Sequence, residues 1–323
     1  MAQGQWPDRP VPKRAAVIAP VSKSLPLRVW DRHTDRPITE WMKDSPQTYE
    51  SYPRGSFRNW LESLAFYDWM IAAYENSRWS VREIQPFIEE HDIDMSEFEP
   101  VRYRSFAVFF ERRFRPGARV FTANPKELAA FAEARYFGWE RHTPDQEFPV
   151  KGQALRAEAI LSDAQRAHPF LGGPVLLARL SPVDYHHVHY PLDGHTVSYD
   201  RRGHRLWIVN PHALANQTDI LFKNERQINV LDAGDFGLIA FVEVGALSVG
   251  HIAQTHPLDQ SFTRGEEKSV FKFGGSAIVV FGEPGKWRPS SDVLAHTREG
   301  METHVRLGEP LGYRMAPDRE SSS

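Results

Sequence analysis

The sequence predicts an α+β protein in which an N-terminal helical segment is followed by a mostly antiparallel β body, built like a sandwich or a barrel. Two patterns predict this class. Apolar side chains recur at helical spacing between residues 56 and 98, and from about residue 145 onward short β-type runs alternate with turn signals. With 323 residues, of which 41% are hydrophobic, the chain is long enough to bury a sizeable core.

The two ends of the chain are polar. Residues 1–45 begin with MAQGQWPDRPVPKR, which is Pro-rich and lacks the apolar region of a signal peptide, so we expect this segment to be irregular. Residues 316–323 are expected to form a disordered tail. No apolar stretch approaches the roughly 18 residues that are needed to span a bilayer.

Residues 46–118 are predicted to form the helical segment. The apolar positions that recur at helical spacing in its first part are Trp60, Leu61, Leu64, Tyr67 and Met70. Ser80, followed by Glu83, forms a capping box before a second helix, and SFAVFFERRFR at 105–115 predicts a third with a solvated basic end. The first apolar face either packs in the core or docks on a membrane surface.

Residues 119–315 are predicted to form a β-rich catalytic domain. Its strand-like runs are PVLLARL, HTVSYD, RLWIV, INVL, FGLIAFVEV and SAIVVF. YDRRGH reads as the turn of a hairpin, and Gly245 separates two strands in GDFGLIAFVEVGALSVGHI.

Composition excludes several classes of function. The formal net charge of −3 offers no basic field for nucleic acid, so we expect no nucleic-acid partner. The absence of cysteine excludes disulfides, thiolate metal sites and a cysteine nucleophile, and it fits a cytoplasmic protein.

A Gly-Gly-Ser sequence interrupts the apolar run FKFGGSAIVVF at residues 271–281. Glycine weakens a strand interior and marks a close approach of another group. Gly274 and Gly275 leave the Gly275 carbonyl open to the hydroxyl of Ser276, an intramolecular attack that proximity accelerates. The G-x-S-x-G pattern of the α/β-hydrolases is absent here.

Three histidines lie within four positions in SPVDYHHVHYPLDG: His186, His187 and His189. Histidine is a frequent metal ligand, but no cysteine and no carboxylate at an obvious spacing completes a site, so a metal is not favoured. A neutral imidazole is suited to act as a base near pH 7.

Seven segments of the chain resemble, in the same order, those of the phosphatidylserine decarboxylases. They are IDMSEF at 93–98, SFAVFFERRFRPGARV at 105–120, FPVKGQ at 148–153, FLGGPVLLARLSPVDYHHVHYPLDG at 170–194, LFKNERQINVLD at 221–232, VEVGALSVGHI at 242–252 and KFGGSAIVVFGEPG at 272–285. The resemblance implies a proenzyme that cleaves itself between Gly275 and Ser276 and converts Ser276 into a covalent pyruvoyl group. That cofactor would carry the decarboxylation, while the protein orients the substrate.

The resemblance also assigns roles to residues. In the family's Tyr-His-x-x-His pattern the second histidine, here His189, deprotonates the serine, and the first, here His186, lies near the substrate carboxylate; His187 holds a variable position. The family's Asp-Gly pair, whose aspartate orients the histidine, aligns with Glu133-Ala134 in FAEARYFGW. Glu133 is either that orienting acid or an ordinary helix glutamate.

The substrate stays open at this stage. The resemblance favours phosphatidylserine, converted to phosphatidylethanolamine at the inner face of a membrane; the alternatives are a soluble amino acid, such as an aromatic one, or an uncleaved member that only binds a ligand or partner. A lipid enzyme needs an apolar docking face, for which the candidates are Phe57, Trp60, Leu61, Leu64, Trp69 and Met70. We expect the two cleaved chains to stay associated and allow for a homodimer.

Overall fold

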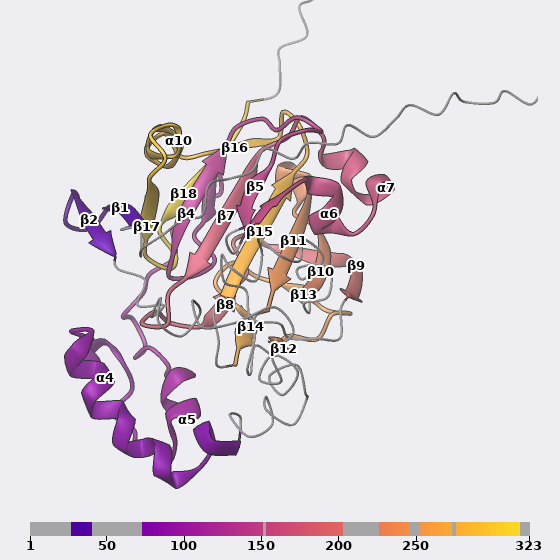
Figure 1. Cartoon of the computed structure of the whole chain (residues 1–323). Coiled ribbons are helices and arrows are strands. Elements are labelled where there is room, and N and C mark those ends of the chain that lie inside the picture. Colours follow the sequence, from indigo (N-terminus) through magenta and orange to yellow (C-terminus); the bar gives the residue numbers. More distant parts are fainter. Residues whose placement is uncertain are drawn as a thin grey trace, which may run out of the picture.

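A large open β-sheet organises the protein. The computed structural model describes residues 27–40, 73–150, 153–202, 226–245, 252–272 and 276–316. The strands of the sheet, in chain order, are β1 (Leu27–Asp31), β2 (Arg36–Glu40), β4 (Ala134–Trp139), β7 (Val175–Leu180), β9 (Gly194–Arg202), β10 (Arg226–Asp232), β11 (Leu238–Val244), β13 (Ser261–Phe262), β15 (Ser276–Gly282) and β17 (Glu302–Val305). Within the described ranges they lie in the order β13-β9-β10-β11-β15-β7-β4-β17-β1-β2 (Figure 1).

Smaller sheets and short helices surround the large one. A three-stranded sheet contains β8 (His187–His189), β12 (Ile252–Gln254) and β14 (Glu267–Phe271). Another contains β3 (Glu127–Ala129), β16 (Trp287–Pro289) and β18 (Pro310–Arg314), and a two-stranded sheet pairs β5 (Phe148–Val150) with β6 (Gln153–Leu155). The α-helices that lie wholly within the described ranges are α4 (Ile84–Glu90), α5 (Phe106–Phe110), α6 (Ala157–Leu161), α7 (Ala164–Ala167) and α10 (Ser291–Arg298). Short 3₁₀ helices span Arg78–Glu83, Met95–Glu97, His168–Phe170 and Gly234–Phe236.

The core fills both faces of the large sheet. β15 is buried along its whole length because it lies between β11 and β7, and successive side chains of a strand point to opposite faces. Ile278 joins the cluster that also contains Val188 of β8 and Phe271 of β14, whereas Val279 joins the cluster that contains Ile160 of α6. The sheet of β8, β12 and β14 therefore covers one face of the large sheet, and α6 covers the other.

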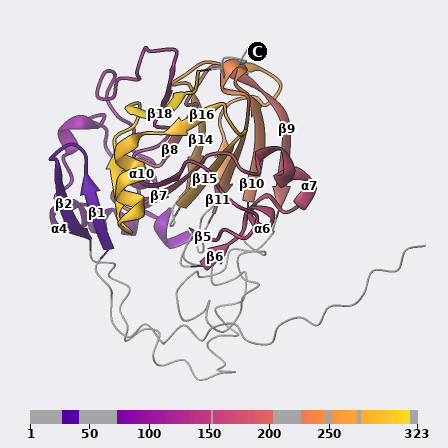
Figure 2. The same cartoon turned by 90° about the horizontal axis from the view of Figure 1, so that it is seen from above.

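The structure corrects parts of the fold expected from sequence. The first residues were expected to be irregular up to residue 45, but β1 and β2 form an antiparallel hairpin, and β1 pairs in parallel with β17 at the edge of the sheet (Figure 2). The large sheet is open, with β13 and β2 at its ends, and does not close into a barrel.

Only part of the predicted helical segment is visible. Residues 41–72, with the proposed apolar docking face, lie outside the described residues. In residues 73–118 the helical elements include the short helices α4 and α5. Ser80 does not cap a helix; its buried hydroxyl accepts a hydrogen bond from the Phe106 amide at 2.8 Å, and so connects the two helices.

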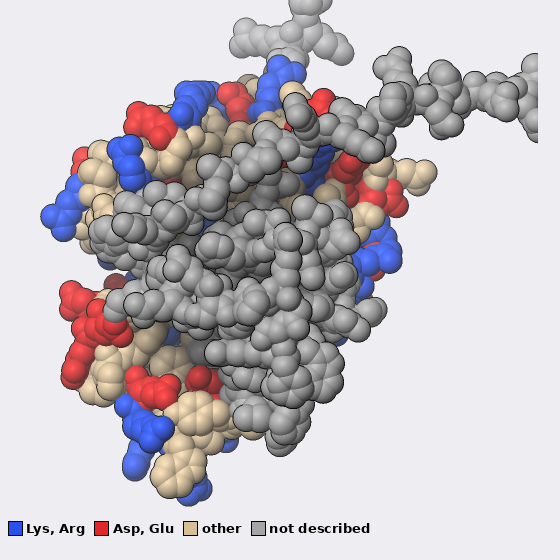
Figure 3. All heavy atoms as spheres, in the orientation of Figure 1, with Lys and Arg blue, Asp and Glu red and all other residues tan. Residues whose placement is uncertain are grey.

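None of the helices in the described ranges is long and apolar enough to cross a bilayer. On the face drawn in Figure 3, the basic and acidic side chains of the described residues are interspersed.

A buried ionic network joins the large sheet to the sheet of β8, β12 and β14. The Lys268 ammonium on β14 lies 2.6 Å from Oε2 of Glu243 on β11, and both side chains are fully buried. Gln254 of β12 donates to the same oxygen at 2.8 Å, and the Ser269 hydroxyl donates to the other. Burial lowers the pKa of Lys268, and the attraction of Glu243 opposes that change.

We expect replacement of one partner alone to be much more damaging than replacement of both. Lys268→Met leaves the Glu243 carboxylate buried without its cation and should lower the free energy of unfolding by about 3–5 kcal/mol. The double variant Lys268→Met/Glu243→Gln removes both charges and should recover most of that loss. Urea unfolding of the single and double variants measures the coupling; additive effects would show that the pair contributes no interaction energy.

Candidate active site

Ser276 is the first residue of β15 and pairs with Leu180, the last residue of β7. Its side chain is 4% exposed and lies on the same face as Ile278, the face covered by β8 and β14. Gly274 and Gly275 lie outside the described residues.

The histidine segment lies beside this serine. Phe271, which ends β14, donates its amide hydrogen to the His186 carbonyl at 3.0 Å. Five residues later the chain reaches Ser276, a span of at most about 18 Å. Figure 1 shows β8 and β14 next to the starting end of β15. The histidine segment and the starting end of β15, ninety residues apart in the sequence, therefore lie near each other in the fold (Figure 1).

His186 is completely buried, and its ring is fixed from one side. Its Nδ1 lies 3.0 Å from the Asp184 carbonyl oxygen, which can only accept, so Nδ1 carries the proton and Nε2 carries the lone pair. Nε2 has no hydrogen-bond partner among the described residues. Burial, together with the nearby Arg112 cation, lowers the pKa of His186 to about 3, so its imidazole is neutral at pH 7.

This buried, neutral histidine predicts a loss of stability in acid. An exposed histidine has a pKa near 6.5, so the unfolded chain binds a proton that the folded chain does not. The contribution of His186 to stability is complete above pH 6.5 and falls by about 1.4 kcal/mol per pH unit as the pH is lowered toward 3. Urea unfolding between pH 7 and 4 measures it. In His186→Asn the dependence should be shallower; parallel curves for the two proteins would contradict the assignment.

His189 also presents a lone pair on Nε2. Its Nδ1 lies 2.8 Å from the Gly265 carbonyl oxygen and therefore carries the proton. The Tyr185 hydroxyl lies 3.3 Å from Nε2, and as the other ring nitrogen is the donor, the hydroxyl donates here. Burial lowers the pKa of His189, while the Gly265 hydrogen bond and the Glu267 carboxylate, opposite on β14, act to raise it.

Glu133 does not form the predicted hydrogen bond to a histidine, and it is not in a helix. It lies in the turn before β4, where its carboxylate accepts from Arg119 at 2.7 Å and from the Leu307 amide at 2.8 Å. The turn is nevertheless next to the site, because the Phe131 carbonyl accepts the amide hydrogen of His189 at 2.9 Å. Glu133 therefore fixes the segments around the histidine, while a backbone carbonyl orients its ring.

Comparison with known proteins agrees with these features. A family model described as phosphatidylserine decarboxylase matches residues 106–313. The chain belongs to the phosphatidylserine decarboxylase family. The phosphatidylserine decarboxylase proenzyme of Ruminiclostridium cellulolyticum is 31% identical over 291 residues, which are 88% of this chain and 97% of the relative. The proenzymes of Clostridium novyi and Fusobacterium nucleatum are 31% and 33% identical, over 80% and 72% of this chain and 89% and 78% of their own.

Several residues at this family site were missed from the sequence. Tyr185 begins the family's histidine pattern, and its place directly before His186 was the available signal. Arg112 was expected to be solvated, but its side chain is 1% exposed and donates to the Asp184 carbonyl at 3.2 Å. No sequence signal pointed to the Gly265 carbonyl, because every residue has a backbone carbonyl.

His187 holds the segment that follows α5 against the site. Its Nε2 lies 3.1 Å from the Glu111 carbonyl, and its Nδ1 lies 3.2 Å from Glu267. Burial acts to raise the pKa of Glu267, but the adjacent His187 ring and the hydrogen-bonded Arg113 guanidinium lower it to about 2. Glu267 is thus an ionised carboxylate beside both histidines of β8.

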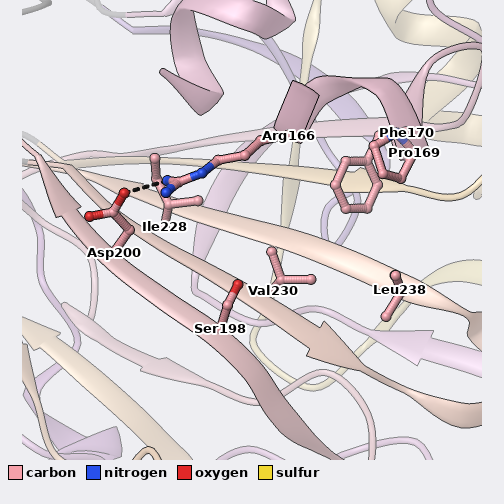
Figure 4. Close-up of a pocket in the computed structure, with 8 residues that line it drawn as sticks. All are labelled: Arg166, Pro169, Phe170, Ser198, Asp200, Ile228, Val230 and Leu238. Carbon is pink, nitrogen blue, oxygen red and sulfur yellow. Dashed lines mark hydrogen bonds and ion pairs between the residues drawn. The ribbon is translucent and has the colours of Figure 1, made fainter. Parts of the chain in front are cut away.

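A separate surface hollow does not belong to this site. Its volume is about 140 Å³, and Figure 4 shows Arg166 and Asp200 pointing toward each other across it as an ion pair. Because these charges already satisfy each other, we assign the hollow no role in the chemistry.

Proposed function

We propose that this chain is a self-cleaving, pyruvoyl-dependent carboxy-lyase that converts phosphatidylserine to phosphatidylethanolamine and carbon dioxide. The curated relatives are named phosphatidylserine decarboxylase proenzymes, and the chain retains the family's Gly-Gly-Ser segment and both site histidines. One observation carries the proposal: Ser276 starts a central strand beside a segment with two neutral histidines whose Nε2 atoms carry lone pairs.

Self-cleavage uses groups of the chain and one water molecule. The Ser276 hydroxyl attacks the Gly275 carbonyl carbon, the peptide C–N bond breaks, and an ester replaces it. Removal of the Ser276 α-hydrogen expels the Gly275 carboxylate and leaves dehydroalanine. Its enamine tautomerises and is hydrolysed by water, which releases ammonia and leaves a pyruvoyl group at the start of the second chain. Gly275 becomes the carboxyl end of the first chain.

His189 is the base that removes the serine proton. Its Nε2 lone pair accepts the proton, while the Gly265 carbonyl holds Nδ1–H and so fixes the tautomer and the plane of the ring. The Glu267 carboxylate stabilises the imidazolium that results.

His186 acts later, on the substrate. The pyruvoyl group supplies a ketone that condenses with the substrate amine and accepts the electrons released when carbon dioxide leaves. His186 keeps its Nε2 lone pair in a buried environment, with the Phe110 ring centroid 3.9 Å from its own, and so can accept a proton near the substrate carboxylate.

The two cleaved chains stay together because the cut falls at the start of a core strand. Residues 276–323 contribute β15, which is hydrogen-bonded to β11 on one side and β7 on the other. They also contribute β17, which pairs with both β1 and β4. Separation would expose side chains on both faces of β15, at roughly 25 cal/mol for each Å² of apolar surface.

Release of carbon dioxide tests this function. Purified protein should decarboxylate phosphatidylserine presented in detergent micelles or vesicles, and should be inactive on free serine and tryptophan. Activity confined to the free amino acids would replace the lipid substrate with a soluble one.

A further inference from the structure

The β1–β2 hairpin lies outside the residues matched by the family model, yet it places a carboxylate in the charged interior of the domain. Glu40, the last residue of β2, accepts from Nε of Arg135 at 2.6 Å and from Nη2 of Arg179 at 3.0 Å. Arg135 is on β4 and Arg179 is on β7, so one side chain of the hairpin contacts two strands of the sheet. Figure 1 shows the hairpin next to β17, and Figure 2 shows it beside α10.

The Arg135 side chain also contacts the segment that leads to the histidines. Its Nη1 forms an ion pair with Oδ2 of Asp184, and both side chains are about 95% buried. The Asp184 carboxylate also accepts the Ser181 amide hydrogen at 2.6 Å, which closes the turn between β7 and the histidines. Arg135 therefore joins the hairpin carboxylate to the residue that shapes this turn.

Asp184 is in direct contact with His186. Its backbone carbonyl is the acceptor for His186 Nδ1 at 3.0 Å and for Nη2 of Arg112 at 3.2 Å. The position of that carbonyl decides the plane of the imidazole, and hence the direction of the Nε2 lone pair. A continuous series of contacts runs from Glu40 through Arg135 and Asp184 to His186.

Charge balance makes this series sensitive to Glu40. Two arginines, the buried Arg135 and the half-buried Arg179, face three carboxylates, because Glu302 also accepts from Arg179 at 2.8 Å. Without Glu40, Arg179 keeps Glu302, but Arg135 keeps only Asp184. The guanidinium then has one fixed partner in place of two, and the turn that depends on it is less firmly held.

We propose that the β1–β2 hairpin is a positioning element for the decarboxylation, in which Glu40 holds Arg135, and through it Asp184, in the place that aims His186. This inference rests on the proposed function in one respect, the role of His186 in turnover. Glu40 is a positioning residue, since it touches neither His186 nor Ser276.

Glu40→Gln in the full-length protein tests the proposal, with Asp292→Asn as the matched control. Asp292 on α10 accepts from Arg32 of the same hairpin at 2.9 Å, so its replacement weakens hairpin docking without touching Arg135. We expect Glu40→Gln to lower kcat on phosphatidylserine by about ten-fold with KM unchanged, because a small misplacement of a reacting group is costly. Self-cleavage, which uses His189, should stay complete by intact mass, and Asp292→Asn should keep kcat within two-fold of wild type.

Hydrogen exchange separates this proposal from the proposed function. Amides of residues 181–187 should exchange faster in Glu40→Gln than in wild type, and should be unchanged in Asp292→Asn. Equal effects of the two substitutions on exchange and on kcat would overturn the positioning role and leave the hairpin with a stabilising one. If the wild-type protein released no carbon dioxide, the proposed function would fail, while the exchange comparison would still decide whether Glu40 holds the turn.

Discussion

Ser276→Ala leaves the chain at its full length and abolishes carbon dioxide release. Alanine has no hydroxyl to attack the Gly275 carbonyl and no oxygen to leave, so neither the cut nor the pyruvoyl group can form. We expect turnover to fall by at least about 10³-fold, the scale of loss when a nucleophile is removed. Denaturing intact mass gives the state of the chain, and carbon dioxide release gives the activity.

The matched control is Ser198→Ala, at an exposed serine on β9. It should cleave and turn over like wild type. Because the Ser276 side chain is small and buried at a strand end, Ser276→Ala should also unfold at nearly the wild-type temperature. Cleavage or activity in Ser276→Ala would show that the nucleophile is elsewhere.

His189→Ala slows self-cleavage by about 10²–10⁴-fold, the usual contribution of a general base. The serine then has to lose its proton to water, whereas in wild type Nε2 is fixed as the acceptor by the hydrogen bond from Nδ1 to Gly265. A time course of the full-length and cleaved masses after synthesis at pH 7 measures the rate.

His187→Ala is the comparison on the same strand. His187 contacts Glu111 and Glu267, so its loss should lower the unfolding temperature but leave self-cleavage within about ten-fold of wild type. If His189→Ala cleaved at the wild-type rate, or if both variants slowed equally, His189 would not be the base.

Sequence patterns predicted the centre of the fold well. The runs VLLARL, INVL, LIAFVEV and SAIVVF correspond to β7, β10, β11 and β15, because continuous apolar β-type runs between turn signals are typical of buried strands. The hairpin at 27–40 was missed. Its strands are short and half-exposed, and β1 pairs with β17, some 270 residues later in the chain, which no local pattern encodes.

The sequence comparison named Ser276 and the histidines because their side chains and order match a family, and their catalytic roles stay predictions. The structure adds that β8 and β14 lie next to the starting end of β15 (Figure 1). The partner of His189 was not predicted, since it is the Gly265 carbonyl, a backbone group without a sequence signal. Glu133 was assigned to the histidine by alignment, but Arg119 and the Leu307 amide hold it instead.

The ionised acid beside His189 is Glu267, which the motif comparison did not consider. It faces His189 across the β14–β8 pair, and its low pKa keeps it charged. The change from the family's Asp-Gly to Glu133-Ala134 therefore need not prevent self-cleavage, because this chain has another carboxylate to stabilise a protonated His189.

The most direct test of the account is the intact mass of the purified wild-type protein under denaturing conditions. The account predicts two chains, residues 1–275 and a second of residues 276–323, and the second should be lighter by one ammonia than a chain that begins with serine. A single full-length mass, stable over days at pH 7, would contradict the central claim and would leave an uncleaved family member that binds without catalysis.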